Sequence, residues 1–383
     1  MKTSSLSRSS ILKAAAAILP LLSGPVLAKE IVDAAGRTVD IDMPAKRVLV
    51  GEARQVSVIA ALAGKHTFDT IVGWRDDLIT KDYDTYSNYL EVFPEIANLP
   101  RFGYVGDGTF SVESAIALKP DVMTLNLESL TAAKESGLEQ TLAAAGIKLV
   151  FIDFRADPDA NMEKSITILG QLFGDGEKAE ALINYRRAEL KRVADRLAEH
   201  PELKQPRVYI ERAPGIVGDE VCCRTFGPVN FGKMIALGGG HNIGADFFAT
   251  FSGDLNPEQL VVSDPEIVVV TGANWAKQSD INQFVSIGPG ADLDAARSRL
   301  AAMMARRPFN SLPAVKAGKV HAIWHQFYGT PYDFVAVQRF AKWFHPEVFA
   351  DLDPDATFRA LHERFLPVPY RPGYFVSLNR ETN

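Results

Sequence analysis

Short runs of apolar, mostly β-branched residues alternate along the chain with stretches in which apolar residues recur every three or four positions. Seven such runs lie at residues 47–51, 68–73, 121–126, 148–153, 207–211, 266–271 and 320–324. Strand, helix, strand at this spacing predicts α/β units built on parallel sheets. The second series of runs resumes after Pro206, so we expect two α/β lobes.

One helical pattern separates the two series. Residues 175–200 are rich in Ala, Glu, Leu, Lys and Arg, and their apolar or small residues recur at near-helical spacing. This predicts an unbroken helix of about seven turns at about 3.6 residues each. The predicted organisation is an N-terminal lobe over residues 29–174, a connecting helix over 175–200 and a C-terminal lobe over 201–383. An ordinary long surface helix is the alternative interpretation.

The first residues of the chain have a different character. Three cations precede an apolar run from Ala14 to Leu22, and a small-residue segment follows and ends at Ala28. This pattern predicts a secretory signal peptide over residues 1–28, cleaved after Ala28. The apolar run is too short for a stop-transfer helix, and no cysteine follows the cleavage point to carry a lipid. We therefore expect a monomer that is free in the periplasm, without a membrane anchor.

Length and charge narrow the class of protein. The chain has 383 residues, 47% of them hydrophobic, and a formal net charge of -6. Removal of residues 1–28, which carry three cations and no acids, makes the remainder more acidic. An acidic surface argues against nucleic acid or anionic lipid as the main partner. The length exceeds that of a usual single core, in agreement with two lobes.

One supersecondary unit occurs twice, at residues 110–125 and 255–270. Each copy starts with a small polar or capping residue, places a glutamate near the first turn of a short helix, and ends that helix with a proline before a buried strand. The two glutamates are Glu113 and Glu258. The repeat indicates that both lobes contain the same unit.

These segments, in this order, resemble the helix-linked class of periplasmic substrate-binding proteins of ABC importers, which carry ferric siderophores, haem and cobalamin. The resemblance covers nearly all of the chain after residue 28, and the segments that carry it are residues 33–39, 44–48, 113–121, 175–200, 238–244 and the segment around Glu258. It implies two Rossmann-like lobes joined by a single long α-helix, a ligand cleft between the lobes, and no enzymatic activity.

The resemblance also implies how the protein meets its importer. In such proteins one surface glutamate per lobe docks onto arginines of the two permease subunits, and the matching positions are Glu113 and Glu258. Two acidic points on a stiff body can steer and register docking onto a two-fold basic surface. The alternative is that each glutamate only stabilises the N-terminus of its helix.

Candidate ligand contacts follow from the predicted strands. In a two-lobe α/β binder, the loops at the carboxyl ends of strands contact the ligand. These loops supply arginines, aromatic residues and one histidine, namely Arg54, Trp74, Arg75, Tyr104, Arg212, Arg224, Trp275, His325 and Tyr328. Ferric siderophores often carry negative charge and planar groups, which guanidinium forks and aromatic faces complement. We therefore predict an anionic ferric siderophore, or a related iron chelate, as the cargo.

Alternatives to this cargo remain open. Haem or a corrinoid would use the same arginine and aromatic contacts. A bare divalent metal needs several convergent His, Asp or Glu ligands, which seven scattered histidines do not indicate, and we expect no metal site or cofactor. An exported enzyme is not favoured, because Gly-x-Ser-x-Gly, His-Glu-x-x-His and Walker motifs are absent.

Two chemical details complete the sequence-based predictions. His325 and Tyr328 carry donor groups that bind iron, and they could reach a metal centre that a siderophore leaves open. A loop histidine satisfied by the protein is the commoner case. Cys222 and Cys223 are the two cysteines of the chain, and an oxidising compartment permits a bond between them. We do not expect that disulfide, because it closes a strained eight-membered ring.

Overall fold

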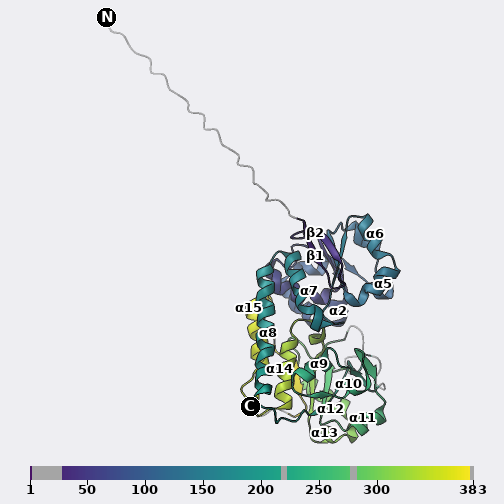
Figure 1. The fold of residues 1–383 in the computed structure, drawn as a ribbon, viewed down its shortest axis with the longest axis vertical. Helices are drawn as coiled ribbons and strands as arrows, with labels where there is room; N and C mark the ends of the chain where they lie inside the picture. Colours follow the sequence, from purple (N-terminus) through teal and green to yellow (C-terminus); the bar gives the residue numbers. More distant parts are fainter. Residues whose placement is uncertain (2–27, 217–221, 277–282, 380–383) are drawn as a thin grey trace.

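The computed structural model describes residues 1, 28–216, 222–276 and 283–379. Two α/β lobes lie one above the other along the longest axis of the molecule, and α8 (Gly176–Ala198) runs along one side of both (Figure 1). The signal peptide predicted over residues 1–28 lies outside the described residues, apart from its first and last positions.

The N-terminal lobe contains a five-stranded parallel sheet of order β5-β4-β3-β6-β7. Its strands are β3 (Val48–Val50), β4 (Ile71–Arg75), β5 (Arg101–Phe102), β6 (Val122–Asn126) and β7 (Lys148–Ile152). All five residues of β6 are buried, as expected of a central strand covered on both faces. An antiparallel hairpin precedes the sheet, formed by β1 (Ala28–Val32) and β2 (Thr38–Asp42).

Short helices cover the N-terminal sheet. They are α1 (Val56–Ala63), α2 (Asp77–Lys81), α3 (Tyr83–Val92), α4 (Val112–Ala117), α5 (Leu130–Glu135), α6 (Leu138–Ala144) and α7 (Pro158–Phe173). Asp157 caps α7 through its side chain, which accepts the backbone N–H of Ala160 at 3.2 Å. Gly174 ends α7 in the left-handed conformation that glycine adopts at low cost.

The C-terminal lobe contains a seven-stranded sheet of order β11-β9-β8-β12-β13-β14, with β10 beside β8. Its strands are β8 (Arg207–Glu211), β9 (Arg224–Phe226), β10 (His241–Asn242), β11 (Ser252–Asp254), β12 (Ile267–Gly272), β13 (Val320–Trp324) and β14 (Phe375–Ser377). The strands β10, β8, β12 and β13 are parallel to one another, as predicted for β8, β12 and β13. The sheet is nevertheless mixed, because the three-residue strands β9, β11 and β14 join its edges in antiparallel orientation.

The helices of the C-terminal lobe surround this sheet. They are α9 (Phe231–Leu237), α10 (Gly244–Phe247), α11 (Pro257–Ser263), α12 (Leu293–Met304), α13 (Pro313–Lys316), α14 (Asp333–Phe344) and α15 (Pro354–Phe365). Helix α14 packs against both α8 and α15, so the connecting helix lies on helices of the C-terminal lobe.

The connecting helix predicted over residues 175–200 is α8. Asp175 caps it by accepting the backbone N–H of Lys178 at 2.9 Å. Leu182 of α8 is fully buried in a hydrophobic cluster that also contains Val58 of α1 and Phe340 of α14. Apolar side chains of both lobes therefore form one continuous core along the connecting helix, and this core fixes how the lobes sit on it.

Candidate functional site

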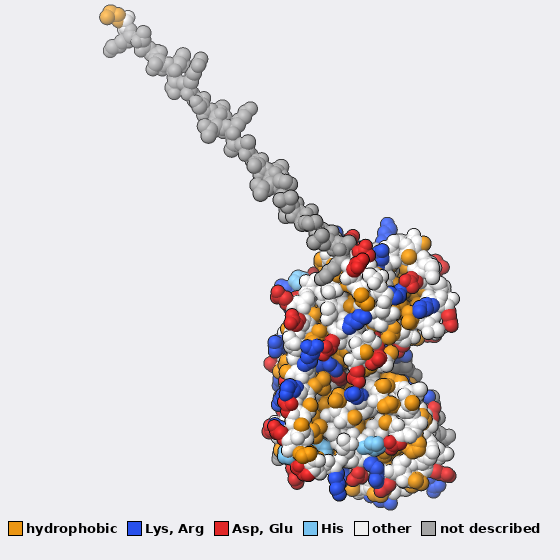
Figure 2. Space-filling model, viewed as in Figure 1, with side chains coloured by type: hydrophobic (Ala, Val, Ile, Leu, Met, Phe, Trp, Pro, Cys, Tyr) orange, Lys and Arg blue, Asp and Glu red, His pale blue; other side chains and the backbone are white. Residues whose placement is uncertain are grey.

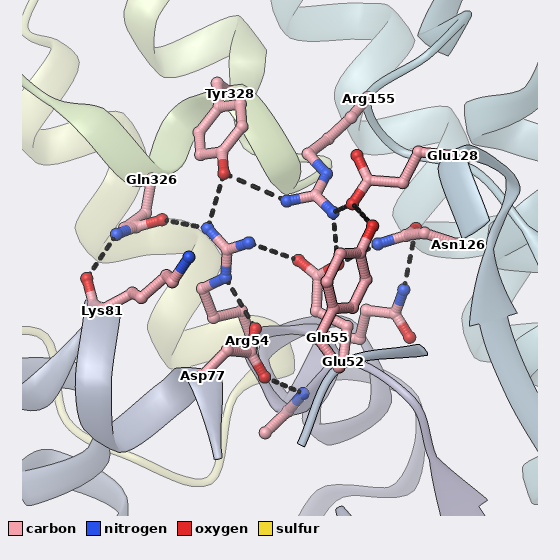
Figure 3. A network of polar contacts seen from close by, with 12 residues as sticks. Glu52, Arg54, Gln55, Asp77, Lys81, Asn126, Glu128, Arg155, Gln326 and Tyr328 are labelled. Atoms are coloured by element: carbon pink, nitrogen blue, oxygen red, sulfur yellow. Dashed lines mark hydrogen bonds and ion pairs between the residues drawn. The ribbon is translucent and has the colours of Figure 1, made fainter. Parts of the chain in front are cut away.

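Polar side chains at the carboxyl ends of the parallel strands meet where the two lobes touch (Figure 3). We call this set the junction cluster, and its members are Glu52, Arg54, Asp77, Glu128, Arg155, Gln326 and Tyr328. The first five follow β3, β4, β6 or β7 of the N-terminal lobe, and the last two follow β13 of the C-terminal lobe. Parallel strands end at one edge of a sheet, so the topology gathers residues that are far apart in sequence.

Arg54 lies at the centre of the junction cluster and is 8% exposed. Its Nε donates to Asp77 at 2.8 Å, and its Nη2 lies 2.9 Å from a carboxylate oxygen of Glu52. Its Nη1 donates to Gln326 at 2.9 Å and to the Tyr328 hydroxyl at 2.7 Å. One guanidinium thus links two acids of the N-terminal lobe to two side chains of the C-terminal lobe.

Arg155 is the second buried guanidinium of the cluster. Its Nη2 donates to Glu52 at 2.6 Å and also to Glu128, and its Nη1 donates to the Tyr328 hydroxyl at 3.0 Å. Burial alone would raise the pKa of Glu52, but the charges of Arg155 and Arg54 outweigh burial and lower that pKa below its ordinary value. Glu52 therefore remains ionised between two arginines.

Tyr328 presents its hydroxyl to both guanidinium groups. Burial would raise the pKa of this phenol, but the charges of Arg54 and Arg155 outweigh burial and lower the pKa of Tyr328 below its ordinary value. The phenol is therefore polarised toward its ionised form. Tyr328 as a whole is only partly buried.

Arg212 follows β8 and carries a guanidinium without an acidic partner among the described residues. Its Cζ lies 5.2 Å from the ring centroid of Phe251 and 5.7 Å from that of Phe226. Its Nε is buried and has no hydrogen-bond partner. Burial, with a further contribution from the charge of Arg224, lowers the pKa of Arg212. A partly buried cation that lacks a counter-ion is electrostatically favourable for an anion.

Arg75 and Tyr104 form a cation–π pair at the edge of the cluster. The Cζ of Arg75 lies 3.9 Å from the ring centroid of Tyr104, and its Nε has no hydrogen-bond partner. The Tyr104 hydroxyl donates to Glu128 at 3.3 Å and accepts from Ser129 at 3.5 Å. The structure therefore brings both predicted residues to the lobe junction.

His325 is 6% exposed and lies in a cluster of rings. Its Nδ1 is 2.9 Å from the Thr271 hydroxyl, and its ring centroid is 5.4 Å from that of Trp275 and 4.6 Å from that of Tyr328. Burial, followed by the charge of Arg212, lowers the pKa of His325 well below its ordinary value. The imidazole is therefore neutral, and its ring packs against the ring of Tyr328.

Two predicted aromatic ligands are buried in the protein interior instead. Trp74 is 1% exposed and packs edge-on against Phe68, because β4 continues through Arg75 and places residue 74 within the strand. Trp275 is 3% exposed and packs against Phe284. The prediction that Trp74 and Trp275 offer their faces to a ligand is wrong for this structure, since neither ring is accessible.

Arg224 also departs from the prediction. It lies in β9, and its Nε donates to Asp254 of β11 at 3.0 Å across the antiparallel pair. This guanidinium is exposed and its charge is already paired. It therefore does not belong to the junction cluster.

The sequence analysis missed the members of the cluster that follow β6 and β7. Glu128 and Arg155 come directly after strands that were predicted at residues 121–126 and 148–153. The rule that ligand contacts follow strand ends applies to these strands as well and would have found both residues. Glu52, Asp77 and Gln326 lie beside predicted residues, but nothing in their spacing indicates that they pair with Arg54.

Glu113 and Glu258 occupy equivalent positions in the two lobes. Each lies in the first turn of its helix, α4 or α11, and each is exposed. Helix α11 lies at the side of the molecule away from α8, and α4 packs against α6, which lies on that same side (Figure 1). Their docking role stays a prediction.

The two cysteines form a disulfide, contrary to our expectation. Cys222 and Cys223 are joined across a cis peptide bond, with their Cα atoms 3.2 Å apart. The pair directly precedes Arg224 of β9.

Within the described part of the chain, no helix is both long and apolar enough to cross a membrane. The same residues contain no group of three or more His, Cys, Asp or Glu arranged to hold a metal ion. The surface is hollowed between the lobes on the side away from α8 (Figure 2).

Two α/β lobes on one long helix, with charged side chains gathered between them, define a two-lobed solute-binding protein. Residues 51–325 match the family described as periplasmic binding protein, and the chain therefore belongs to that family. This confirms the resemblance to the helix-linked class and the predicted fold class. Members of the family are solute-binding transport proteins and not enzymes, in agreement with our prediction.

Similar proteins bind different solutes. The structure of the TroA-like periplasmic binding protein FepB from Veillonella parvula has a TM-score of 0.82 at 30% identity, covering 91% of this chain and 99% of that one. A cobalamin-binding protein from Halobacterium salinarum is 31% identical over 183 residues, which are 47% of this chain and 45% of the relative. The match thus spans about half the length of that relative. The molybdate-binding protein MolA from Haemophilus influenzae is 22% identical over 93% of this chain and 96% of its own.

Proposed function

We propose that this protein is the periplasmic solute-binding component of an ABC importer and that its cargo is an anionic ferric siderophore. The observation that carries the proposal is the guanidinium of Arg212, which lies on two aromatic rings without any acidic partner among the described residues. Its pKa responds to the charges of Tyr328 and Arg155, so it lies within electrostatic reach of the junction cluster.

The charge balance between the lobes supports an anionic cargo. The arginines of this region are Arg54, Arg75, Arg155 and Arg212, and the carboxylates that form ion pairs within it are Glu52, Asp77 and Glu128. All three carboxylates pair with Arg54 or Arg155, which leaves Arg75 and Arg212 without an acid at ion-pair distance in the part of the chain that the structure describes. Buried guanidinium groups bind carboxylate, catecholate or phosphate oxygens through charge-assisted hydrogen bonds. Aromatic rings at Phe251 and Tyr328 complement the planar groups of such chelates.

A corrinoid or haem is the second candidate. The similarity to the cobalamin-binding protein favours a corrinoid, although the match covers less than half of that relative. Both candidates present broad rings and peripheral acidic or amide groups, so the same arginines and aromatic side chains would serve them. The distinction lies in charge, because the unpaired arginines favour the more anionic complex.

Delivery of the cargo requires a permease. We propose that Glu113 and Glu258 dock on arginines of the two permease subunits, one from each lobe. Support comes from their equivalent exposed positions in the first turns of α4 and α11. Exposed acids at a fixed separation suit a basic surface with two-fold symmetry.

A binding screen tests the proposed cargo. Native mass spectrometry and tryptophan fluorescence quenching should compare ferric catecholates, hydroxamates and carboxylates with haem, cyanocobalamin and molybdate. We expect the wild type to bind an anionic ferric complex, and Arg212→Met to weaken this binding by about ten- to a hundredfold, because a charge-assisted contact is lost. The exposed Arg359→Met variant is the control and should bind as the wild type does.

Two results would contradict the proposal. If only cyanocobalamin, haem or molybdate binds, then the ferric siderophore assignment is wrong and the family function stands. If a ferric complex binds equally well to the wild type and to Arg212→Met, then the unpaired guanidinium is not the anion site.

A further inference from the structure

One carboxylate of the junction cluster differs from the others in how it is held. Glu52 and Asp77 are 3% and 0% exposed, and each contacts more than one donor of the N-terminal lobe. Glu128 is 38% exposed at its side chain and follows β6 in a short 3₁₀ turn. It contacts Arg155 and the Tyr104 hydroxyl through a single carboxylate oxygen.

This difference indicates which of the three carboxylates a ligand can displace from the junction cluster. Removing Glu52 would take one ion-pair partner from each of two buried guanidinium groups, and removing Asp77 would take one of the two acids from Arg54. Both carboxylates are buried, so we treat them as structural. Glu128 can turn into solvent at a lower cost than the other two acids, because its carboxylate is already partly hydrated. Arg155 would keep its contacts to Glu52 and Tyr328 when Glu128 leaves.

We propose that Glu128 occupies the position of an anionic group of the cargo and competes with it for Arg155, so that Glu128 is a specificity-determining residue of the binding site. The inference rests on the proposed function. In the ligand-free protein the Glu128 carboxylate neutralises Arg155 and accepts from Tyr104. An oxygen ligand that arrives from between the lobes meets the same two donors.

The competition has a consequence for selectivity. A neutral or weakly charged solute does not compensate the displaced contact of Glu128 with Arg155, so it is disfavoured. A strongly anionic complex replaces the carboxylate with its own oxygens and also meets the unpaired charges of Arg75 and Arg212. Glu128 therefore lowers the affinity for every solute that contacts Arg155, and only a solute with strongly anionic oxygens replaces the contact that Arg155 loses.

The test uses the full-length protein and defined probes. The probes are ferric tris-catecholate, ferric citrate and cyanocobalamin, and binding is followed by tryptophan fluorescence quenching in the wild type and in Glu128→Gln. We expect Glu128→Gln to bind the anionic probe about tenfold more tightly, because one like charge is removed and a weaker acceptor competes. Glu95→Gln, at an exposed glutamate of the same lobe, removes the same charge outside the cluster and should change the affinity by less than about twofold.

The results separate this inference from the proposed function. If the wild type binds an anionic probe and Glu128→Gln binds it equally or less tightly, then Glu128 does not compete with the cargo for Arg155 and instead positions Arg155. The proposed function would still stand. If neither protein binds an anionic probe, the proposed function itself fails. A gain for Glu128→Gln that Glu95→Gln matches would also overturn the inference, since only net charge would then matter.

Discussion

Buried charged side chains depend most strongly on the tertiary structure, because it determines which ion-pair partners surround them. The side chains of Arg54 and Arg155 are each 8% exposed, yet each contacts at least one carboxylate and the Tyr328 hydroxyl. Asp82, by contrast, is buried without an arginine at ion-pair distance among the described residues. Its main contact is a hydrogen bond with Thr85, and it lines a cavity of about 10 Å³ at the lobe junction.

Asp82→Asn should remove a pH dependence of stability. Burial raises the pKa of Asp82 from its ordinary value to about 8, so the folded protein holds a proton that the unfolded chain releases near pH 4. Stability from this group is therefore greatest below pH 4 and is lost as the pH rises toward 8. The free energy of unfolding of the wild type should fall between pH 5 and 8 by on the order of a few kcal/mol relative to Asp82→Asn.

Denaturant unfolding at several pH values measures this difference. Asp40→Asn, at an exposed aspartate of β2, is the matched control and should keep the pH dependence of the wild type. Parallel curves for the wild type and Asp82→Asn would show that Asp82 is ionised in the folded protein.

Helix α8 contacts both lobes. Two neighbouring arginines of this helix form ion pairs that differ in their burial. Arg186 makes two contacts with Asp333 of α14, at 2.7 and 2.6 Å, and both side chains are nearly buried. Arg187 pairs with Glu163 of α7, and its side chain is 60% exposed. The buried pair fastens the connecting helix to the C-terminal lobe, while the exposed pair lies on the surface of the N-terminal lobe.

Arg186→Met should destabilise the protein by about 3–5 kcal/mol, because it leaves the Asp333 carboxylate buried without its partner. Arg187→Met removes the exposed pair and should cost about 1 kcal/mol or less. Unfolding in guanidinium chloride, followed by tryptophan fluorescence, measures both. The double variant Arg186→Met with Asp333→Leu should recover most of the loss, since no uncompensated charge remains. Equal losses for Arg186→Met and Arg187→Met would show that the buried pair does not fasten α8.

The sequence predicted elements better than it predicted their ends. The connecting helix was expected over residues 175–200 and spans Gly176–Ala198, because both its cap at Asp175 and its apolar spacing are local features. β4 was expected to end at residue 73, but it continues to Arg75 through its pairing with β3 and β5. This extension buries Trp74, and it arises from neighbouring strands that the local pattern does not contain.

At the scale of the whole molecule, the two lobes are held together on two sides. One side is α8 with the continuous apolar core. The other side is α3, where the Asn274 side chain donates to Asp84 at 2.8 Å and Arg371 donates to Glu91 at 3.1 Å. Contacts on both sides of the junction cluster limit the relative motion of the lobes. A body of this kind presents its outer surface to a partner in a nearly fixed geometry.

The double variant Glu113→Ala with Glu258→Ala should abolish uptake, because it removes both proposed contacts with the permease. Its cargo affinity should stay within about twofold of that of the wild type, because both glutamates are exposed and neither contacts the junction cluster. Uptake of the labelled cargo by cells of the source organism, together with fluorescence titration of the purified variants, measures the two properties separately. Glu180→Ala with Glu347→Ala changes the net charge equally at exposed positions elsewhere and should leave uptake intact. Normal transport by the Glu113 and Glu258 double variant would disprove docking through these residues.

The sequence by itself determined the features that depend on local order. Short runs of apolar residues predicted the strands, and helical spacing with a capping residue predicted α8. The ends of the predicted strands indicated the loops that contain Arg54, Arg212 and Tyr328. Six of the nine predicted ligand contacts lie at or beside the lobe junction: Arg54, Arg75, Tyr104, Arg212, His325 and Tyr328. Their binding of a ligand remains a prediction.

Only the tertiary structure decided which charges meet. Arg155 contacts Glu52 across 103 positions of sequence and Tyr328 across 173, and no local pattern encodes such pairs. The fold also left Arg212 without an acid and paired Arg224 with Asp254. Local spacing fixes an element because its hydrogen bonds are local, whereas the partner of a buried charge depends on how separate elements pack.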